Sequence, residues 1–285
     1  MTERLSEIEE RIDSVGQLSS VVGAIRGIAA ARLREGQDRL DGVRAYAEAV
    51  AVAIGEALAL LPQARAPAVD DSPEGSGLII ALCSEQGFVG AYNSRVLDAA
   101  GALANAAGTK LFVIGDHGLA VTNERGLDVA WSAPMAVHAD ETTELANRLA
   151  DLLYDEVGRG ARSATIVHAA PATAGEPPIV ERSLIPFDFD RFPAARLAEP
   201  PLLTLPPEDL LAQLAEEYVF AELCEACVIA FAAENEARMR AMISAHENVA
   251  SRLDDLKASA RRRRQEEITS EVVELAAGVE AARLR

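Results

Sequence analysis

Proline is missing from both ends of this chain of 285 residues. Residues 1–61 and 208–285 contain none, and all 13 prolines lie between Pro62 and Pro207. Proline disrupts the interior of a helix and is common in turns and loops. This distribution therefore permits long helices at both ends and concentrates the loops in the middle of the chain.

Other scarcities narrow the class of protein. The three cysteines are a small odd number, which fits a reducing compartment rather than a disulfide framework. No run of 18 apolar residues is present and the N-terminus is charged, so we expect neither a membrane-spanning helix nor a signal peptide. A formal net charge of -18 disfavours nonspecific nucleic-acid binding. Aromatic residues, at 4%, suit thin helix pairs better than one thick core.

Apolar residues recur at both ends with the steps of three and four that mark one face of a helix. In the first segment they are Leu5, Ile8, Ile12, Val15, Leu18, Val22, Ile25 and Ala29. In the last segment they are Met242, Val249, Leu253, Leu256 and Ala260, then Ile268, Val272, Leu275 and Val279. A continuous helix from 207 to 285 would measure on the order of 110 Å, too long for a compact domain. We therefore predict that the two terminal helices pair as an antiparallel coiled coil.

Glycines interrupt the first helical segment, although each costs roughly 1 kcal/mol relative to alanine in a helix. They are Gly16, Gly23, Gly27, Gly36 and Gly42. We interpret them as points of close packing on the partner helix. A smooth section that turns against another surface is the alternative.

The middle of the chain alternates predicted strands with predicted helices. Residues 62–77 have the composition of a linker. Strands are expected at 77–84, 110–114, 127–131, 164–169 and 179–185, and helices at 94–107 and 140–157. This order predicts a small α/β domain with a mainly parallel, Rossmann-like sheet. We expect an N-terminal coiled-coil helix at 1–61, the α/β domain at 62–206 and a C-terminal coiled-coil helix at 207–285.

The loop after the first predicted strand lacks the motifs of a nucleotide site. It carries only Gly87-x-x-Gly90, without the third glycine of a dinucleotide fingerprint or the Gly-Lys-Ser/Thr of a P-loop. We interpret it as a tight turn, with Asn93 or Ser94 capping the helix that follows.

Other motifs for chemistry are also missing. Cys224 and Cys227 lie in a helical stretch with no second pair, so we interpret them as buried residues rather than a redox or metal pair. The four histidines are scattered, and no Gly-x-Ser-x-Gly elbow occurs. The sequence predicts no catalytic, cofactor-binding or metal-binding residues.

Charged residues interrupt the apolar stripe of the last segment at 261–267, Arg-Arg-Arg-Arg-Gln-Glu-Glu. The stripe requires apolar residues near 263 and 267, so the partner of this turn is not simply the first helix. The run is interpreted as a solvated face, as a basic nucleic-acid site, or as a contact with an acidic surface of another protein. The flanking acids and the net charge disfavour the second interpretation.

Several motifs of the chain match one known family in order and spacing. In the C-terminal segment they are Glu234–Met242 (ENEARMRAM), His246–Asn248 (HEN), Arg264-Gln265-x-x-Ile268-Thr269-x-Glu271, and Glu274 through Gly278 to Ala281. Residues 22–34 and the loop Gly87-x-x-Gly90-x-x-Asn93 are similar to the same family. The chain thus resembles the gamma subunit of F-type ATP synthases over nearly its whole length, most specifically at its two ends.

The resemblance implies a mechanism. The coiled coil would insert into a hexamer of alpha and beta subunits, and the α/β domain would lie with an epsilon subunit on the membrane c-ring. Arg264, Gln265 and Thr269 match positions that touch a catch loop of one beta subunit, and Ile25 and Arg26 match positions near the beta lever region. The chain would be a non-catalytic rotor that couples ion flow to ATP synthesis or hydrolysis, on the cytoplasmic face of the bacterial plasma membrane.

The chain also departs from the family pattern. Ile25, Gly27, Ala31 and Arg32 stand within the family's Met-x-Met-Val-Ala-Ala-Ser-Lys segment, and residues 85–90 (EQGFVG) replace Asp-Arg-Gly-Leu-Cys-Gly. Together with the acidity, these departures fit a divergent or alternative complex, such as a sodium-linked one. The coupling ion stays open, because its ligands lie on other subunits. Outside the family, the alternatives are a stand-alone α/β enzyme and a non-rotary coiled-coil adaptor with an α/β domain.

Overall fold

The computed structural model describes residues 4–61, 76–105, 108–172, 175–195 and 202–283. Its elements are α1 (Leu5–Leu60), β1 (Ser76–Leu82), α2 (Tyr92–Ala104), β2 (Lys110–Ile114), α3 (Asp116–Arg125), β3 (Trp131–Ala133), η1 (Ala139–Glu141), α4 (Thr142–Gly158), β4 (Ala161–Ala169), β5 (Ile179–Ile185), η2 (Phe189–Arg191) and α5 (Pro207–Arg283). The chain divides into a smaller unit, Met1–Ile28 with Met239–Arg285, and a larger unit, Ala29–Arg238. Both α1 and α5 contribute residues to each unit.

The larger unit contains a five-stranded sheet in the order β3-β2-β1-β4-β5. The four strands β1 to β4 are parallel, and β5 pairs antiparallel with β4 at one edge. The central strand β1 aligns Ile80 with Phe112 of β2 and with Ile166 of β4. The predicted fold class, a mainly parallel sheet inserted between long terminal helices, is confirmed.

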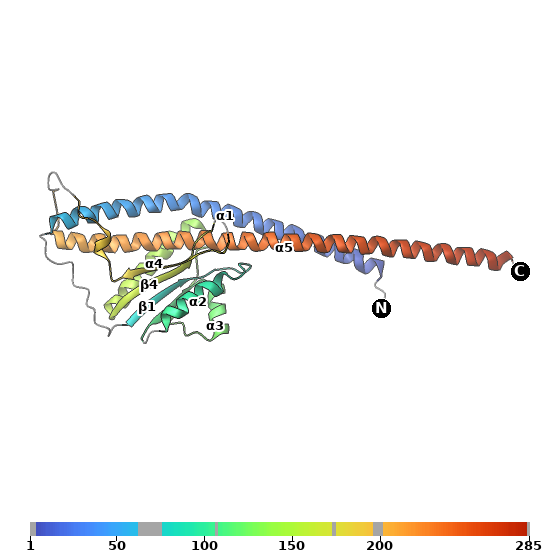
Figure 1. Ribbon diagram of the computed structural model, residues 1–285, viewed down its shortest axis with the longest axis horizontal. Coiled ribbons are helices and arrows are strands. Elements are labelled where there is room, and N and C mark those ends of the chain that lie inside the picture. Colours follow the sequence, from blue (N-terminus) through green and yellow to red (C-terminus); the bar gives the residue numbers. More distant parts are fainter. Residues whose placement is uncertain (1–3, 62–75, 106–107, 173–174, 196–201, 284–285) are drawn as a thin grey trace. The chain divides into compact units, whose positions relative to one another are not determined.

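Helices cover both faces of this sheet (Figure 1). Successive side chains of a strand point to opposite faces, so Leu78, Ile80 and Leu82 pack with α4 and α5, where Phe231 is buried. Ile79 and Ala81 pack on the other side against α2 and α3. Because both faces are buried, the inner strands β1 and β2 are continuous apolar runs rather than alternating patterns.

The helices α1 and α5 run antiparallel in both units. In the larger unit Arg44 pairs with Glu225 at 3.0 Å, and in the smaller unit Glu9 pairs with Arg264 at 2.7 Å. Along the predicted stripes, the buried residues are Ile8, Val22, Ala29, Met242 and Leu256. The stripe prediction is wrong at Leu18, which is 49% exposed, and at Ile268, Val272 and Leu275, which are also exposed. The side chain of Val279 lies outside the described residues.

Only one of the five helical glycines that the sequence singled out packs closely. A Cβ atom at Gly36 would lie 3.1 Å from Cβ of Ala232 and 3.2 Å from the ring of Phe231, so α1 and α5 approach each other there. At Gly16, Gly23, Gly27 and Gly42 a Cβ would meet nothing within 4 Å. The packing interpretation is confirmed for Gly36 and wrong for the other four.

Several predicted elements shift, and one was missed. The third strand, predicted at 127–131, begins at Trp131, because Gly126 ends α3 in a left-handed conformation and residues 127–130 make the connection. Helix α3 was not predicted because its buried residues are Gly118 and Thr122, which form no apolar stripe. The linker prediction at 62–77 falls, as far as residue 75, outside the described residues.

All three cysteines are buried and free, which confirms the interpretation of Cys224 and Cys227 as buried residues. Burial raises the pKa of Cys83 to about 12 and that of Cys224 to about 11. These thiols therefore stay protonated near neutral pH, which argues against a redox or metal role for the pair Cys224 and Cys227. Within the described part of the chain, no helix combines the length and apolar content that crossing a bilayer requires.

Acid is expected to destabilise the larger unit through His168. This residue is buried in β4, and its Nδ1 donates a hydrogen bond of 3.0 Å to the carbonyl oxygen of Ala169. Burial lowers the pKa of the imidazole below its ordinary 6.5, more than this hydrogen bond raises it. The unfolded chain therefore binds the proton more readily as pH falls below 6.5, so the free energy of unfolding decreases toward acid.

This pH effect can be measured with urea unfolding between about pH 7.5 and pH 5.5, where one such group contributes a slope of at most about 1.4 kcal/mol per pH unit. Substitution His168→Gln removes the titrating group and is expected to flatten the slope. An equal slope in the variant and the native chain would assign the acid sensitivity to other residues.

Candidate functional site: an exposed helix turn and a buried helix anchor

The five predicted contact residues all lie in the smaller unit, on two helices. Ile25 and Arg26 belong to α1, and Arg264, Gln265 and Thr269 belong to α5. Ile25 is half-buried, whereas the other four are exposed. An exposed charged or polar side chain on a stiff helix is available to a partner protein, which is the chemistry that the charged run at 261–267 predicts.

Arg264 has an intramolecular partner. Its Nη2 donates to Oε1 of Glu9 at 2.7 Å, and the two side chains remain 64% and 49% exposed. The first helix therefore does contact this turn at Arg264, while much of both side chains stays accessible to a further partner. Exposed ion pairs of this kind contribute only about 0–1 kcal/mol. The guanidinium can therefore exchange Glu9 for another carboxylate at little cost.

The surrounding turn is polar, as predicted. Thr269 donates from Oγ1 to the carbonyl oxygen of Gln265 at 2.8 Å, which links these two residues along the helix. Arg263 donates to Glu266 at 2.7 Å. A shallow groove of about 550 Å³ beside Arg264 is lined by Glu9, Ile12, Asp13, Lys257, Ala260 and Arg261. Both signs of charge line it, which fits a protein contact better than a phosphate site.

The five predicted residues form two groups rather than one. Arg264 pairs with Glu9, and Ile25 lies 16 residues further along α1. At ~1.5 Å per residue this separation is about 24 Å. A single small loop of a partner cannot touch both groups, so they require two different contact surfaces.

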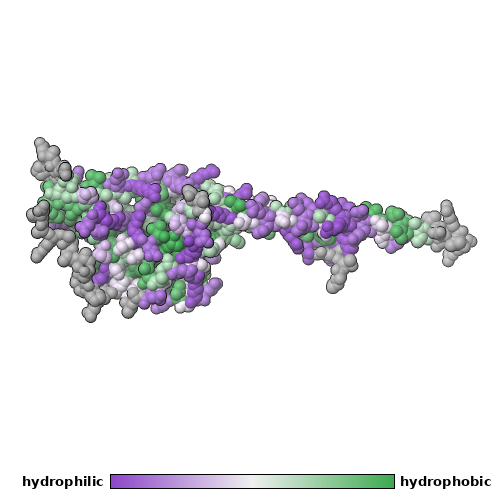
Figure 2. Space-filling model, viewed as in Figure 1, coloured by the Kyte–Doolittle hydropathy of each residue, from purple (hydrophilic) through white to green (hydrophobic). Residues whose placement is uncertain are grey.

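Apolar residues are exposed beyond the polar turn. They are Ile268, Val272, Val273 and Leu275, and Figure 2 shows hydrophobic residues at the surface near the C-terminal end of α5. A second exposed set, Leu18, Val21 and Ile28, lies on α1. Exposed apolar residues at helical spacing mark faces that pack against other proteins.

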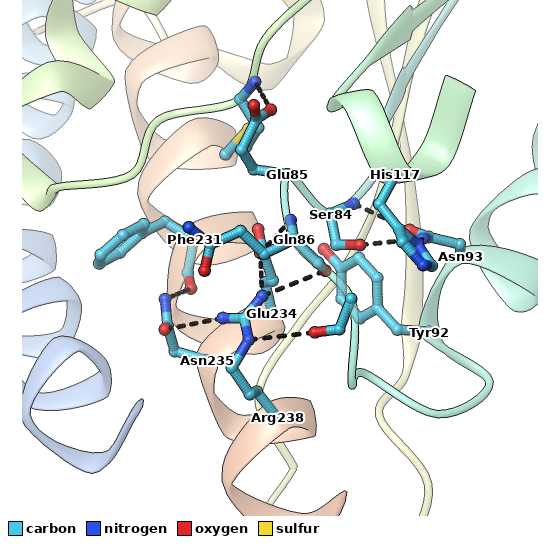
Figure 3. Close-up of polar contacts among 12 residues, drawn as sticks. Ser84, Glu85, Gln86, Tyr92, Asn93, His117, Phe231, Glu234, Asn235 and Arg238 are labelled. Carbon is cyan, nitrogen blue, oxygen red and sulfur yellow. Dashed lines mark hydrogen bonds and ion pairs between the residues drawn. The ribbon is translucent and has the colours of Figure 1, made fainter. Parts of the chain in front are cut away.

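A second concentration of charge lies in the larger unit, where α5 meets the loop after β1 (Figure 3). Arg238 donates from Nη2 to Oε1 of Glu234 at 2.5 Å and from Nη1 to Oδ1 of Asn235 at 3.1 Å. It also donates to the carbonyl oxygens of Gln86 and Gly87, at 3.2 and 3.3 Å. The cluster is nearly inaccessible to solvent, since Glu234 is 3% and Arg238 6% exposed.

The carboxylate of Glu234 faces backbone amides. Its Oε1 accepts from the N–H of Gln86 at 3.4 Å. Burial raises the pKa of Glu234, and the guanidinium of Arg238 and the amides of Glu85 and Gln86 oppose this rise. Removing either partner of such a buried pair leaves an uncompensated charge.

Two further carboxylates tie the same edge of the sheet together. Glu85 accepts from the N–H of Asp116 after β2, at 3.2 Å, and from the N–H of Met135 after β3, at 2.7 Å. Glu236 of α5 accepts from the N–H of Ala172 after β4, at 2.9 Å. Internal carboxylates thus take the hydrogen bonds that phosphates take in nucleotide-binding domains, which argues against a nucleotide site in this loop.

The predicted cap of α2 is wrong. Neither Asn93 nor Ser94 caps this helix, because its N-cap residue is Ala91 and no side-chain hydrogen bond caps it. Asn93 instead accepts the N–H of Ser84 at 2.8 Å and donates to Oγ of Ser84. Its buried amide therefore fixes the start of the loop after β1.

Sequence reasoning missed the roles of Glu85, Glu236 and Arg238. Glu236 and Arg238 lie within the Glu234–Met242 motif, but in a sequence they have the pattern of a solvated helix face. The available signal for Glu236 and Arg238 was their position on the same helix shortly after the apolar stretch Ala230–Ala233.

The class of fold is that of ATP synthase central stalks. A chain of the Euglena gracilis mitochondrial ATP synthase, solved with F1 and the c-ring in rotational state 3, superposes with a TM-score of 0.69 at 15% identity, covering 97% of this chain and 94% of that one. A chain of the Tetrahymena thermophila enzyme, from its central stalk and c-ring structure, gives 0.55 at 18% identity, covering 79% and 99%.

Sequence comparison identifies the family. A family model described as ATP synthase matches residues 4–282, so the chain belongs to the ATP synthase family. The ATP synthase gamma chain of Bdellovibrio bacteriovorus is 25% identical, covering 97% of this chain and 98% of the relative. That of Frankia casuarinae is 27% identical over 99% and 98%. The resemblance drawn from the motifs is confirmed, and neither the stand-alone enzyme nor the adaptor is favoured.

Proposed function

We propose that the chain is the rotor subunit of the central stalk in an F-type ATP synthase. It couples ion flow through a membrane ring to the cycling of catalytic sites on alpha and beta subunits. The observation that carries this proposal is α5, one uninterrupted helix from Pro207 to Arg283 that is buried in the α/β domain and continues into the smaller unit. A rotor requires such a stiff element, anchored at one end and exposed at the other.

The contacts follow from the two groups of exposed residues. Arg264, Gln265 and Thr269 bind a loop of one beta subunit, and Ile25 and Arg26 contact its lever region. An acidic group of the beta subunit takes the place of Glu9 on Arg264, since the existing pair is exposed and weak. The α/β domain contacts the epsilon subunit and the c-ring.

The chain supplies no catalytic group in this proposal. ATP chemistry belongs to the alpha and beta subunits, and the asymmetry of the rotor sets their states. The whole complex transports protons or sodium ions. The rotor is held at the cytoplasmic face of the bacterial plasma membrane through its partners.

The test is co-expression of the chain with the alpha and beta subunits of its own genome. We expect a complex of three alpha, three beta and one copy of this chain, and ATP hydrolysis that depends on the chain. The double substitution Arg264→Ala and Gln265→Ala removes a charged hydrogen-bonding contact. It is expected to lower the rate of ATP hydrolysis by the assembled complex about tenfold.

Glu9→Ala is the matched control. It breaks the same ion pair from the other side but leaves Arg264 free for the beta subunit, so hydrolysis should stay at the native rate. If both variants lost activity equally, the ion pair itself rather than a stator contact would matter. A well-folded chain that forms no complex would refute the rotor proposal.

A further inference from the structure

The crevice where α/β domains hold ligands is filled in this protein by its own helix. Ligands bind such sheets beyond the carboxyl ends of the strands, at the point where the strand order reverses. Here that point lies between β1 and β4, since β2 and β3 extend to one side of β1 and β4 to the other. The loops after β1 and β4 both contact α5 there, through Glu234 and Glu236.

The polar groups of α5 match those of the loops in kind and position. The carboxylates of Glu234 and Glu236 accept backbone N–H groups of Gln86 and Ala172. The guanidinium of Arg238 donates to the carbonyl oxygens of Gln86 and Gly87. One helical turn of α5 thus forms hydrogen bonds with both backbone donors and backbone acceptors of the loop after β1.

This polar match does something that the neighbouring apolar packing cannot. Phe231 and Ala233 hold α5 against the sheet, but apolar contact has no directionality. Charge-assisted hydrogen bonds to fixed backbone groups are directional and short-ranged. They therefore oppose rotation of α5 about its own axis and sliding along it.

We propose that Glu234, Glu236 and Arg238 form a torsional clamp, in which α5 occupies the ligand crevice of the α/β domain so that helix and domain turn as one body. Arg238 is the last residue of the larger unit, and from Met239 the helix belongs to the smaller one. The clamp therefore binds the last turn of α5 that belongs to the larger unit. The docking stands on the contacts alone, whereas its role in transmitting torque rests on the proposed rotor function.

The docking is tested by amide hydrogen exchange on the full chain. The combined variant Glu234→Gln, Glu236→Gln and Arg238→Met removes all three charges without leaving one of them buried and unpaired. The amides of Gln86 and Ala172 should then exchange at least about tenfold faster, while those of β1 keep their protection. Glu216→Gln, the same substitution at an exposed site of α5, should change neither.

The torque role is tested in the complete complex in sealed vesicles, as ions transported per ATP hydrolysed. The combined variant should lower this ratio at least about twofold relative to the native chain and to Glu216→Gln. Unchanged exchange at Gln86 and Ala172 would refute the docking. Faster exchange with an unchanged ratio would refute the torque role.

Two further outcomes are separable. If β1 also lost protection in the combined variant, Arg238→Lys would decide in the same assays, because it keeps the charge pair but loses the forked contacts to the loop carbonyls. If the native complex neither assembled nor transported ions, the rotor proposal would fail while the exchange result still judged the docking.

Discussion

Replacing Gly118 with alanine is expected to destabilise the α/β domain by about 3 kcal/mol or more, as severe overpacking does. A Cβ atom at this position of α3 would lie 2.0 Å from Cβ of Cys83 and 3.5 Å from its Cα. Cys83 is fully buried directly after β1, so its backbone cannot withdraw without shifting the central strand. Urea unfolding of the purified chain measures the loss.

The clash can be tested from both sides. Cys83→Gly removes the Cβ atom with which alanine at position 118 would clash. The double variant of Cys83→Gly and Gly118→Ala should therefore lose less free energy of unfolding than the two single variants lose together. Gly101→Ala in α2 is the matched control, because a Cβ there meets nothing within 4 Å. It should stabilise by up to about 1 kcal/mol through helix propensity. Strictly additive losses at 83 and 118 would show that contact with Cys83 is not the cause.

Phe231→Ala is expected to cost about 3–5 kcal/mol, the range for removing a buried aromatic side chain. Phe231 is 1% exposed and packs in the cluster formed by α4, α5 and one face of the sheet. Its ring also lies 3.2 Å from the Cβ position of Gly36, so it supports the packing of α1 as well. The cavity would therefore loosen both the domain and its helix pair.

Phe220→Ala is the control, since this aromatic residue of α5 is only partly buried against the same cluster. It should lose clearly less than Phe231→Ala in thermal or urea unfolding. Phe231→Leu should recover most of the loss, because leucine refills much of the volume with apolar atoms. Equal losses at 220 and 231 would contradict the assignment of Phe231 to the core.

The elements of this fold were largely predictable because their signals are local. The absence of proline and the steps of three and four determine α1 and α5. Strands β2 and β5 occupy the predicted residues 110–114 and 179–185. The apolar run of β2 buries well in a covered sheet, whereas β5 is a partly exposed edge strand with polar residues at its centre. Helix α3 was not predicted, because it packs through Gly118, and glycine has no side chain that could contribute to an apolar stripe.

The candidate site also has features that the sequence indicates and features that only the tertiary structure shows. Arg264 and Gln265 stand out in the sequence because charge interrupts a periodic apolar stripe, and their role as a stator contact stays a prediction from the motif that they match. That Glu9 holds Arg264, across 255 residues of sequence, is a tertiary fact. The separation of Ile25 from Arg264 follows from the antiparallel register, which periodicity alone leaves free.

Periodicity and composition determined which segments are helices and strands, because each depends on neighbours within a few residues. Only the tertiary structure decided that Glu234, Glu236 and Arg238 are buried rather than solvated. Gln86 and Gly87, the loop partners of Arg238, lie 152 and 151 residues before it, and Ala172, the partner of Glu236, lies 64 residues before that residue. Whether a charge on a helix meets water or a backbone amide is settled by what folds against it, and no local pattern records that.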